Sequence, residues 1–440
     1  MALEERDFDV IVVGAGCAGA SAAYTAAKLG KSVLVIERGE SAGVKNMTGG
    51  RLYAHSLRDM FKKYEGEDFD LDGDNPFERR IAHERICLLD AQGAMTIDYT
   101  SDKLGVAGQD SYAVLPTKLD AWLCEKAEDA GCEMIFGIPV EELLKDEAGN
   151  VIGVRAGEDE MTAQVVIVAE GQNSLLTERF LGAKRPATNE MAVGIKEVFE
   201  LPAKDIESRF LCMPGEGAAQ LWVGDCTKGN VGGGFMYTNE DTISLGLVAT
   251  IKELSESDTT IDQMMEDFKN HPAVAPIIAG AKMVEHSGHM VSEGGANMTP
   301  QLVHGGALVC GDAAMLCMNL GYQVRGMDLA IASGQMAAEA ACAAIDAEDV
   351  SAAGLAGYKT AMDGSFVMKD LNTFKKWPAT MEHWDRMFTE YPKMVVEIFD
   401  SMFVVDGKPQ LPLMKRIMPI VKQRGLVKLG KEVLAAIKAL

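Results

Sequence analysis

Hydrophobic residues near the start of the chain follow the pattern of a buried parallel strand. The run from Phe8 to Val13 is apolar and rich in β-branched side chains. Ala20 to Leu29 is alanine-rich and predicts a helix that ends at Gly30, and Ser32 to Ile36 predicts a second strand. The order of strand, glycine turn, helix and strand is typical of a parallel α/β unit.

The pattern changes further along the chain. Between Met191 and Val291, segments such as Thr242 to Leu247 alternate polar and apolar residues, which favours an antiparallel sheet with one wet face. Ala307 to Cys310 returns to the buried-strand pattern, and an alanine-rich helix is predicted from about Met327 to Ile345. We therefore expect an α/β fold with a discontinuous Rossmann-like domain at 1–185 and 301–347. An inserted antiparallel-sheet domain is expected at 186–300 and a helical C-terminal region at 348–440.

The net charge and the hydropathy of the chain disfavour several classes of protein. The 440 residues carry 42 Lys and Arg against 65 Asp and Glu, a net charge of −23, which disfavours binding to nucleic acid. No apolar run is long enough for a spanning helix, and the N-terminus lacks the layout of a signal peptide. The expected location is the cytoplasm.

The nine cysteines do not predict a metal or disulfide site. No two of them have the C-x-x-C spacing of zinc or redox sites, and the cysteine run of an iron–sulfur cluster is absent from the sequence. Buried, reduced thiols are the simplest interpretation.

The first glycine turn predicts a dinucleotide site. Gly14, Gly16 and Gly19 form a G-x-G-x-x-G string between the first strand and its helix, where glycine lets a pyrophosphate approach the backbone. Glu37 ends the second strand and is placed to accept the ribose hydroxyls of an adenosine, which argues against a 2′-phosphate. The alternative is a glycine turn in an α/β protein that binds no nucleotide.

A second motif favours FAD over NAD. Gly311 and Asp312 follow a predicted strand far downstream, where an aspartate can bond the sugar-alcohol chain that only a flavin nucleotide has. The helix that begins near Gly326 and Met327 would direct its positive N-terminus at the flavin ring. Taken alone, Asp312 could equally be a helix cap.

Three segments together resemble the FixC-type flavoproteins, relatives of electron transfer flavoprotein–quinone oxidoreductase. They are Asp9 to Gly19, Val35 to Leu57 and Gly311 to Ala330, with weaker matches at Met264 to Gly280 and Gly232 to Asn239. The broader fold is shared with geranylgeranyl reductases and aromatic hydroxylases.

The resemblance implies a set of FAD-binding residues. Glu37 would contact the adenosine ribose, Asn46 to Gly50 would lie beside the flavin, Asp312 would hold the ribityl chain, and Gly326 and Met327 would meet the pyrimidine edge. The full expected set is Gly14, Gly16, Ala18, Gly19, Glu37, Arg38, Asn46, Thr48, Gly49, Gly50, Val140, Ala169, Gly171, Gly311, Asp312, Gly321, Gly326 and Met327.

The sequence departs from the family pattern in two places. Glu170 precedes Gly171 where the family has aspartate, so Glu170 is expected to pack differently against the nucleotide. The arginine that the family often has near the start of the helix containing Trp122 is missing, and the nearest residues are Pro116 and Lys118.

The resemblance also implies the chemistry and the partners. Electrons would pass through FAD from an electron transfer flavoprotein toward quinone or a separate ferredoxin-like iron–sulfur subunit, without a catalytic side chain or a metal. Tyr322 and Arg325 are the candidates for the acceptor pocket, whereas His55 and His271 are expected to be structural. Two alternatives stay open: a geranylgeranyl-type isoprenoid reductase, and an assembly subunit with structural FAD.

The C-terminus has a charge pattern of its own. From Pro412 to Leu440, seven basic residues face one glutamate, a net charge of +6, and apolar residues are interleaved with them. This amphipathic segment is expected to lie on an anionic membrane surface, on an acidic partner or on the acidic body of the protein itself.

Overall fold

A parallel sheet forms the first half of the molecule. The structure is a computed structural model that describes residues 3–47, 50–71, 73 and 75–440. Six strands of this sheet lie in the order β16 (Val303–His304), β17 (Ala307–Val309), β10 (Asp159–Val168), β1 (Phe8–Val13), β2 (Val33–Glu37) and β7 (Glu133–Phe136). The strands from β17 to β7 are parallel, and the antiparallel pair β8 (Val140–Lys145) and β9 (Val151–Ala156) extends from β10.

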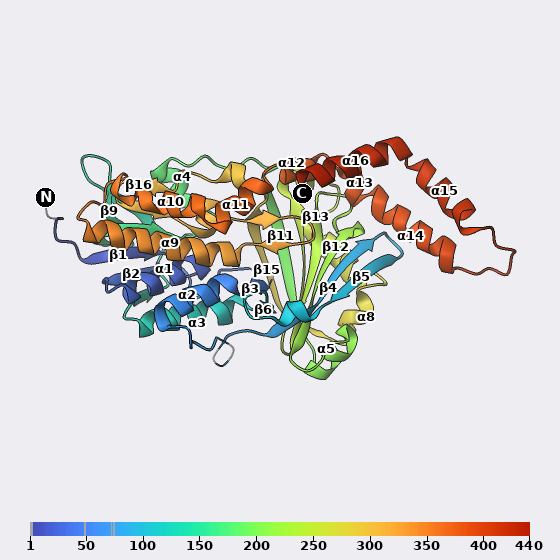
Figure 1. The fold of residues 1–440 in the computed structure, drawn as a ribbon, viewed down its shortest axis with the longest axis horizontal. Coiled ribbons are helices and arrows are strands. Elements are labelled where there is room, and N and C mark those ends of the chain that lie inside the picture. The colour runs from blue at the N-terminus through green and yellow to red at the C-terminus, as the bar shows by residue number, and fades with distance from the viewer. Residues whose placement is uncertain (1–2, 48–49, 72, 74) are drawn as a thin grey trace.

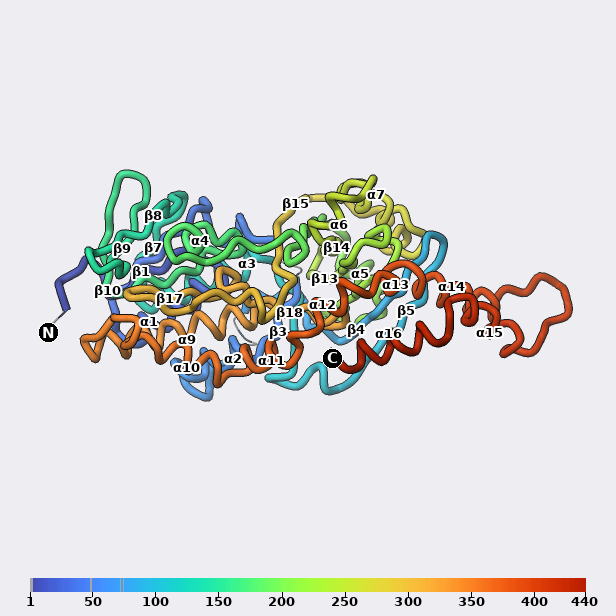
Figure 2. The backbone as a smooth tube through the Cα atoms, turned by 90° about the horizontal axis from the view of Figure 1, so that it is seen from above, coloured from blue at the N-terminus to red at the C-terminus, as the bar shows by residue number. Residues whose placement is uncertain are grey.

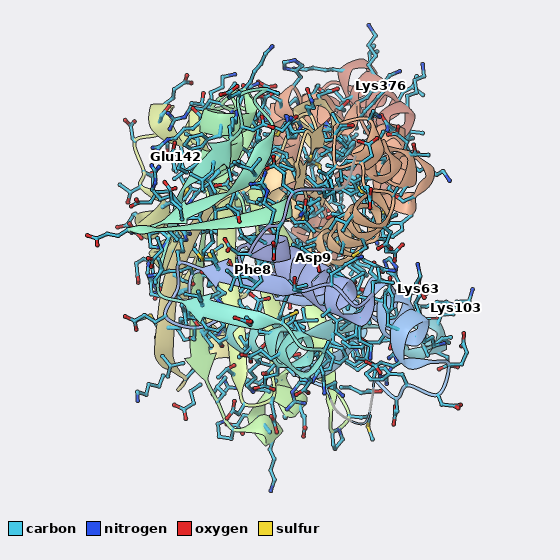
Figure 3. The ribbon with its side chains drawn as sticks, turned by 90° about the vertical axis from the view of Figure 1, so that its left-hand side faces the viewer. Phe8, Asp9, Lys63, Lys103, Glu142 and Lys376 are labelled. Atoms are coloured by element: carbon cyan, nitrogen blue, oxygen red, sulfur yellow. The ribbon has the colours of Figure 1, made fainter. Side chains whose placement is uncertain are left out.

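The predicted buried strands occupy the middle of this sheet. Val10, Ile11 and Val12 of β1 and Val165 to Val168 of β10 are buried, as expected for a sheet that is covered on both faces. Phe8 and Asp9, where β1 begins, lie near the middle of Figure 3, and the charged side chains of Lys63, Glu142 and Lys376 lie toward its margin.

Helices cover the sheet and bring distant segments together. The α1 helix (Cys17–Lys28) packs between α3 (Pro116–Asp129) and α9 (Met327–Asp346), and α2 (His55–Glu65) also lies on α9 (Figure 1). The approach of α9 to α1 depends on Gly334, because a Cβ atom at that position would lie 2.1 Å from the carbonyl oxygen of Ala18. A short α4 (Leu175–Leu181) follows β10.

A second, largely antiparallel sheet forms the other half. Eight of its nine strands lie in the order β15 (Lys282–Ser292), β11 (Met191–Glu200), β14 (Thr242–Thr250), β13 (Gly232–Thr238), β12 (Glu216–Gly224), β4 (Arg79–Leu89), β6 (Ser111–Ala113) and β3 (Arg51–Tyr53), and β5 (Ala94–Thr100) pairs with β4. Its helices are α5 (Ala203–Phe210), α6 (Ile251–Glu256), α7 (Ile261–Asn270) and α8 (Ala275–Ile278).

The expected segment 186–300 accounts for only part of this second sheet. The strands β3 to β6 come from residues 51–113, ahead of that segment, and β4 runs parallel to β12. The chain therefore crosses between the two halves more than once. The expected α/β fold class is confirmed by this arrangement of a Rossmann-like sheet, a mainly antiparallel sheet and C-terminal helices.

The C-terminal region is helical, as predicted. It contains α10 (Gly357–Gly364), α11 (Phe366–Thr373), α12 (Trp377–Glu382), α13 (Asp385–Phe388), α14 (Glu390–Phe403), α15 (Leu413–Gln423) and α16 (Leu426–Ala439). The end of α14, the following loop and α15 project from the body as an arm, which we define as residues 399–423 (Figures 1 and 2). The α16 helix returns to the body, where Ala436 and Ala439 are buried.

None of the helices in the described part of the chain has the length and apolar character needed to cross a bilayer.

Candidate functional site

The first glycine turn has a geometry that only glycine tolerates. Gly14 has a φ of 100°, and a Cβ atom there would lie 2.4 Å from the carbonyl oxygen of Ala169. A Cβ atom on Gly19 would lie 1.8 Å from the carbonyl oxygen of Gly14. These contacts hold α1 tightly over the ends of β1 and β10, as the motif predicts.

The N-terminus of α1 is open to an anion. Its N-cap is Gly16, no side chain among the described residues caps it, and its first turn contains no acidic residue. The N–H groups of this turn therefore keep their capacity to bind phosphate oxygens, aided by the helix dipole. The second motif meets the same turn, because a Cβ atom on Gly311 would lie 2.6 Å from the Cβ of Ala18.

Glu37 is held in place by backbone groups on two sides. Its Oε2 accepts a hydrogen bond of 2.9 Å from the N–H of Ala15, and its Oε1 accepts one of 2.7 Å from the N–H of Gly39. Each carboxylate oxygen keeps further acceptor capacity, which suits two ribose hydroxyls.

Two carboxylates near the second motif leave acceptor capacity unused. Within the described residues the Asp312 side chain makes no hydrogen bond or ion pair, and burial raises the pKa of its carboxyl. Oδ1 of Asp328, in the first turn of α9, is buried and has no partner in the part of the chain that the structure describes. Because buried polar atoms are normally paired, Oδ1 of Asp328 fits a bound polar group, and the partly exposed Asp312 carboxyl keeps acceptor capacity for the same group.

Asp120 is a buried acid of the site that the sequence did not single out. Its carboxylate accepts hydrogen bonds of 2.5 Å from Nδ2 of Asn46 and 3.3 Å from Sγ of Cys17. Burial raises its pKa to about 6, and the charges of Glu37 and Asp312 act in the same direction. The sequence offers one indication of this residue, namely an acidic side chain between Leu119 and Trp122 in the predicted helix that contains Trp122.

Glu293 is a second acid that the sequence did not single out. Burial raises its pKa to about 7, while a hydrogen bond of 3.2 Å from Nδ2 of Asn319 acts in the opposite direction. Asn319 lies in β18 (Met318–Asn319), which pairs with β19 (Val324–Arg325) just before α9. Glu293 follows the end of β15, so it joins the second sheet to the segment between Asp312 and α9.

The two departures from the family pattern have structural explanations. The Glu170 carboxylate accepts from the N–H groups of Leu176 and Thr177 at 2.8 and 2.7 Å, so it caps the start of α4. Lys118 pairs with Glu78 at 2.6 Å, and Pro116 opens α3. Neither residue at the start of α3 replaces the missing guanidinium group.

Most of the expected cofactor residues lie around this one turn. Contacts join Gly14 to Ala169, Gly16 to Asn46 and Ala18 to Gly311, and Gly171 follows Glu170 with a φ of 78°. The remaining members lie elsewhere. Arg38 is exposed after β2, and Val140 of β8 pairs with Ala156 of β9. Gly50 faces the carbonyl of Val114, and Gly321 faces Trp377. Gly326 and Met327 stand at the start of α9. Thr48 and Gly49 lie outside the described residues.

A pocket of about 580 Å³ adjoins the start of α9 and is lined by both expected acceptor residues, Tyr322 and Arg325. Its lining is mixed. Apolar and aromatic side chains come from Ile86, Ile97, Tyr99, Leu104 and Leu221, and charged or titratable ones come from Arg51, His55, Glu84, Arg85, Asp110 and Arg325. Glu84 pairs with Tyr99 across β4 and β5, so the two kinds of side chain lie next to each other.

Two arginines of the lining are held by ion pairs. Arg51 donates to both carboxylate oxygens of Glu84, and its guanidinium lies 4.4 Å from the ring centre of Tyr53. Arg325 donates to Asp328 at 2.6 and 2.8 Å and to Asp370 at 2.7 Å. Both guanidinium charges are thus paired with carboxylates, whereas the Tyr322 side chain is half-exposed.

The chain is similar to known proteins over its whole length. Residues 9–183 match the model of FAD dependent oxidoreductases, and residues 377–440 match the ETF-QO/FixC family C-terminal domain. A FixC protein of Salmonella typhi is 47% identical over all of both chains. A probable electron transfer flavoprotein-quinone oxidoreductase of Escherichia coli is 46% identical over 98% of both chains.

A solved structure shares the fold. The geranylgeranyl bacteriochlorophyll reductase-like protein from Thermoplasma acidophilum superposes with a TM-score of 0.71, covering 98% of this chain and 99% of the other. Only 19% of the residues are identical, so this likeness concerns the fold alone.

Proposed function

Because the chain belongs to the FixC family of FAD-dependent oxidoreductases, we propose that it passes electrons from an electron transfer flavoprotein to a quinone. The observation that carries this proposal is the pocket beside α9, whose lining combines apolar and charged side chains. FAD supplies the chemistry, since its ring accepts electrons singly or in pairs.

The described residues suggest how FAD is held. The open first turn of α1 would bind the diphosphate, Glu37 the adenosine ribose and Asp312 the ribityl chain. Gly326 and Met327 would lie along the pyrimidine edge, where the N-terminus of the 20-residue α9 stabilises negative charge. A diphosphate bound near Asp120 would raise the pKa of this carboxyl further, because two negative charges repel each other.

The pocket suits a quinone for a chemical reason. A quinone has a flat ring with carbonyl oxygens that accept hydrogen bonds, and biological quinones carry an apolar tail. Tyr322, His55 and Arg325 offer hydrogen-bond donors in the pocket, and Ile86, Ile97 and Tyr99 of β4 and β5 offer apolar surface. The turn between β4 and β5 meets α14 at Val396, on the helix that leads into the arm.

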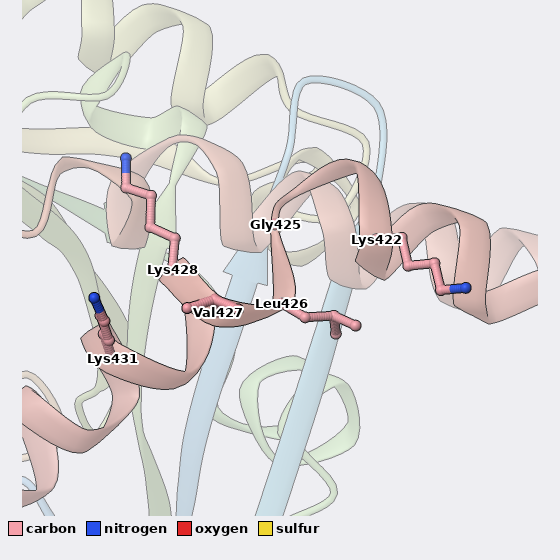
Figure 4. Close-up of a pocket in the computed structure, with 6 residues that line it drawn as sticks. All are labelled: Lys422, Gly425, Leu426, Val427, Lys428 and Lys431. Carbon is pink, nitrogen blue, oxygen red and sulfur yellow. The ribbon is translucent and has the colours of Figure 1, made fainter.

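The arm supports a peripheral membrane contact. Phe403, Val404 and Val405 at its tip are 72%, 65% and 75% exposed. Lys415 and Lys422, and Lys431 and Lys438 beyond the arm, make no ion pair with any described residue. Lys422, Lys428 and Lys431 surround a hollow of about 520 Å³ at the turn between α15 and α16 (Figure 4). An apolar tip beside unpaired lysines suits an anionic bilayer, in which a quinone would also be dissolved.

Part of the C-terminal charge is used within the molecule. Arg424, between α15 and α16, pairs with Glu397 of α14 at 2.8 Å, and Glu432 of α16 pairs with Arg386 of α13 at 3.2 Å. These two ion pairs anchor the segment to α13 and α14, while its lysines are exposed.

The proposal is tested with the FAD-loaded protein under anaerobic conditions. Reduced electron transfer flavoprotein should bleach the flavin absorbance of this protein, and a short-chain quinone should restore it. A prenyl lipid or a ferredoxin-like protein would be added in parallel. Restoration by a prenyl lipid alone would favour an isoprenoid reductase, and a flavin that is never reduced would favour an assembly subunit.

A further inference from the structure

His55 lies where the pocket meets the start of α9. It is the first residue of α2, it lines the pocket, and its side chain is 29% exposed. Its Nε2 lies 3.1 Å from Oδ2 of Asp328. The imidazole therefore connects the pocket to the helix turn that begins at the expected pyrimidine edge of the flavin.

Asp328 is set up to hold this imidazole. Its side chain is 1% exposed, and Oδ2 also accepts two hydrogen bonds from Arg325. Phe366 packs edge-on against the His55 ring with centroids 4.9 Å apart, and Asp370, on the same helix as Phe366, pairs with Arg325. The carboxylate is thus balanced by Arg325, and the ring is fixed between α9 and α11.

The second ring nitrogen of His55 is less constrained. The hydroxyl of Ser56 lies 3.4 Å from Nδ1, at the long limit of a hydrogen bond. With Nε2 held by a carboxylate, Nδ1 is the nitrogen that can exchange a proton with a molecule in the pocket. A histidine oriented by a buried carboxylate is the arrangement that enzymes use for proton transfer.

We propose that His55 donates a proton to a carbonyl oxygen of the quinone bound in this pocket, and that Asp328 is its positioning residue. This inference rests on the proposed function. Reduction of a quinone to a hydroquinone takes two electrons and two protons. FAD, when bound and reduced, would supply both electrons. At one quinone oxygen, the N–H bond of the imidazolium breaks and an O–H bond forms, and the neutral imidazole then takes up a proton from solvent. The second quinone oxygen takes its proton from solvent as well.

The test separates proton-coupled from proton-free oxidation. Wild-type protein, H55Q and D328N are photoreduced without any partner protein and mixed with a short-chain quinone or with ferricenium, which accepts an electron and no proton. H55Q should be reoxidised by quinone about 10- to 100-fold more slowly, with ferricenium oxidation unchanged. D328N should show the same selectivity with a smaller effect.

A matched control is available on the second sheet. His83 has its Nδ1 3.0 Å from Oδ1 of Asp98, but it does not line the pocket, so H83Q should behave as wild type. Should H55Q fold poorly, H55A offers a second route, because added imidazole should restore at least part of its quinone rate.

A measurement on the FAD-free protein checks the contact between His55 and Asp328 directly. The chain has seven histidines, so the imidazole ¹⁵N signals can be assigned with H55Q. The D328N substitution should shift the Nε2 signal of His55 and leave that of His83 in place.

The outcomes separate the two hypotheses. Reoxidation of H55Q by quinone at the wild-type rate would overturn the role of His55 and leave the proposed function intact. Equal slowing with quinone and ferricenium, or no rescue by imidazole, would indicate a structural role and would also overturn it. Wild-type protein that quinone cannot reoxidise would overturn the proposed function together with this inference.

Discussion

Asp120 shows how one residue makes the fold sensitive to pH. Burial raises the pKa of its carboxyl from 3.8 to about 6, so the folded protein holds this proton more tightly than the unfolded chain does. The stability linked to this group is therefore present below about pH 4 and is lost as the pH rises through about 6.

Replacing Asp120 by asparagine should remove this dependence. The free energy of unfolding of FAD-free D120N, relative to wild type, should increase by on the order of 3 kcal/mol between about pH 4 and about pH 7. Urea unfolding at both pH values measures the change, with the exposed D363N variant as the control. A difference that stays constant with pH would contradict the prediction.

At the scale of elements, the approach of α9 to α1 sets the shape of the nucleotide site. The contact between Gly334 and Ala18 places the helix of the second motif directly against the first glycine turn. The two motifs are more than 290 residues apart in sequence, and this packing brings them to one site.

A methyl group at this contact should therefore weaken both stability and cofactor binding. We expect G334A to lose about 1–3 kcal/mol of unfolding free energy and to retain less FAD after gel filtration. G357A is the matched control, because a Cβ atom there meets nothing within 4 Å and the backbone is helical. That variant should be neutral or more stable by up to about 1 kcal/mol. Equal behaviour of the two variants would show that the helix contact is not tight.

The elements that could be predicted from sequence are those whose pattern reflects burial directly. The strands β1, β10 and β17 are apolar because both faces of their sheet are covered, and the glycine turn has a steric signature of its own. The strands β4 and β5 were missed because their charged residues satisfy one another across the sheet. Arg85 pairs with Asp98, and Glu84 pairs with Arg51 of another element.

The candidate site was predictable to a similar degree. Residues that act through backbone geometry, such as Gly14 and Gly19, follow from a motif with fixed spacing. Asp120 and His55 acquire their roles from partners 74 and 273 residues away, Asn46 and Asp328. Such pairings depend on how the helices pack, and no local pattern reports them.

At the scale of the whole molecule, the arm and the body of the protein have opposite net charges. The arm carries Lys408, Lys415, Arg416 and Lys422 against Asp400 and Asp406, a net charge of +2, on a protein whose total charge is −23. An anionic bilayer should therefore attract the arm and repel the body, which would orient the molecule on the surface.

Removing the apolar tip should weaken this association. F403S/V405S should weaken binding to vesicles of anionic phospholipid by about 30-fold or more in a co-sedimentation assay, since the loss of two exposed apolar side chains removes about 2 kcal/mol or more of transfer energy. L211S/M213S changes two similarly exposed apolar residues after α5 and should bind as wild type does. Equal binding by all three proteins would show that the arm does not contact lipid.

The late position of β17 in the chain has a consequence for biosynthesis. This strand pairs with β10 next to the centre of the first sheet, yet it is translated only after the second sheet has been made. Until Ala307 to Val309 leave the ribosome, Val166 to Val168 of β10 lack the strand that pairs with them on one side. The FAD contacts proposed for Gly311 and Asp312 would form later still, and a nascent chain stalled before that point would expose an unpaired strand edge to chaperones or aggregation.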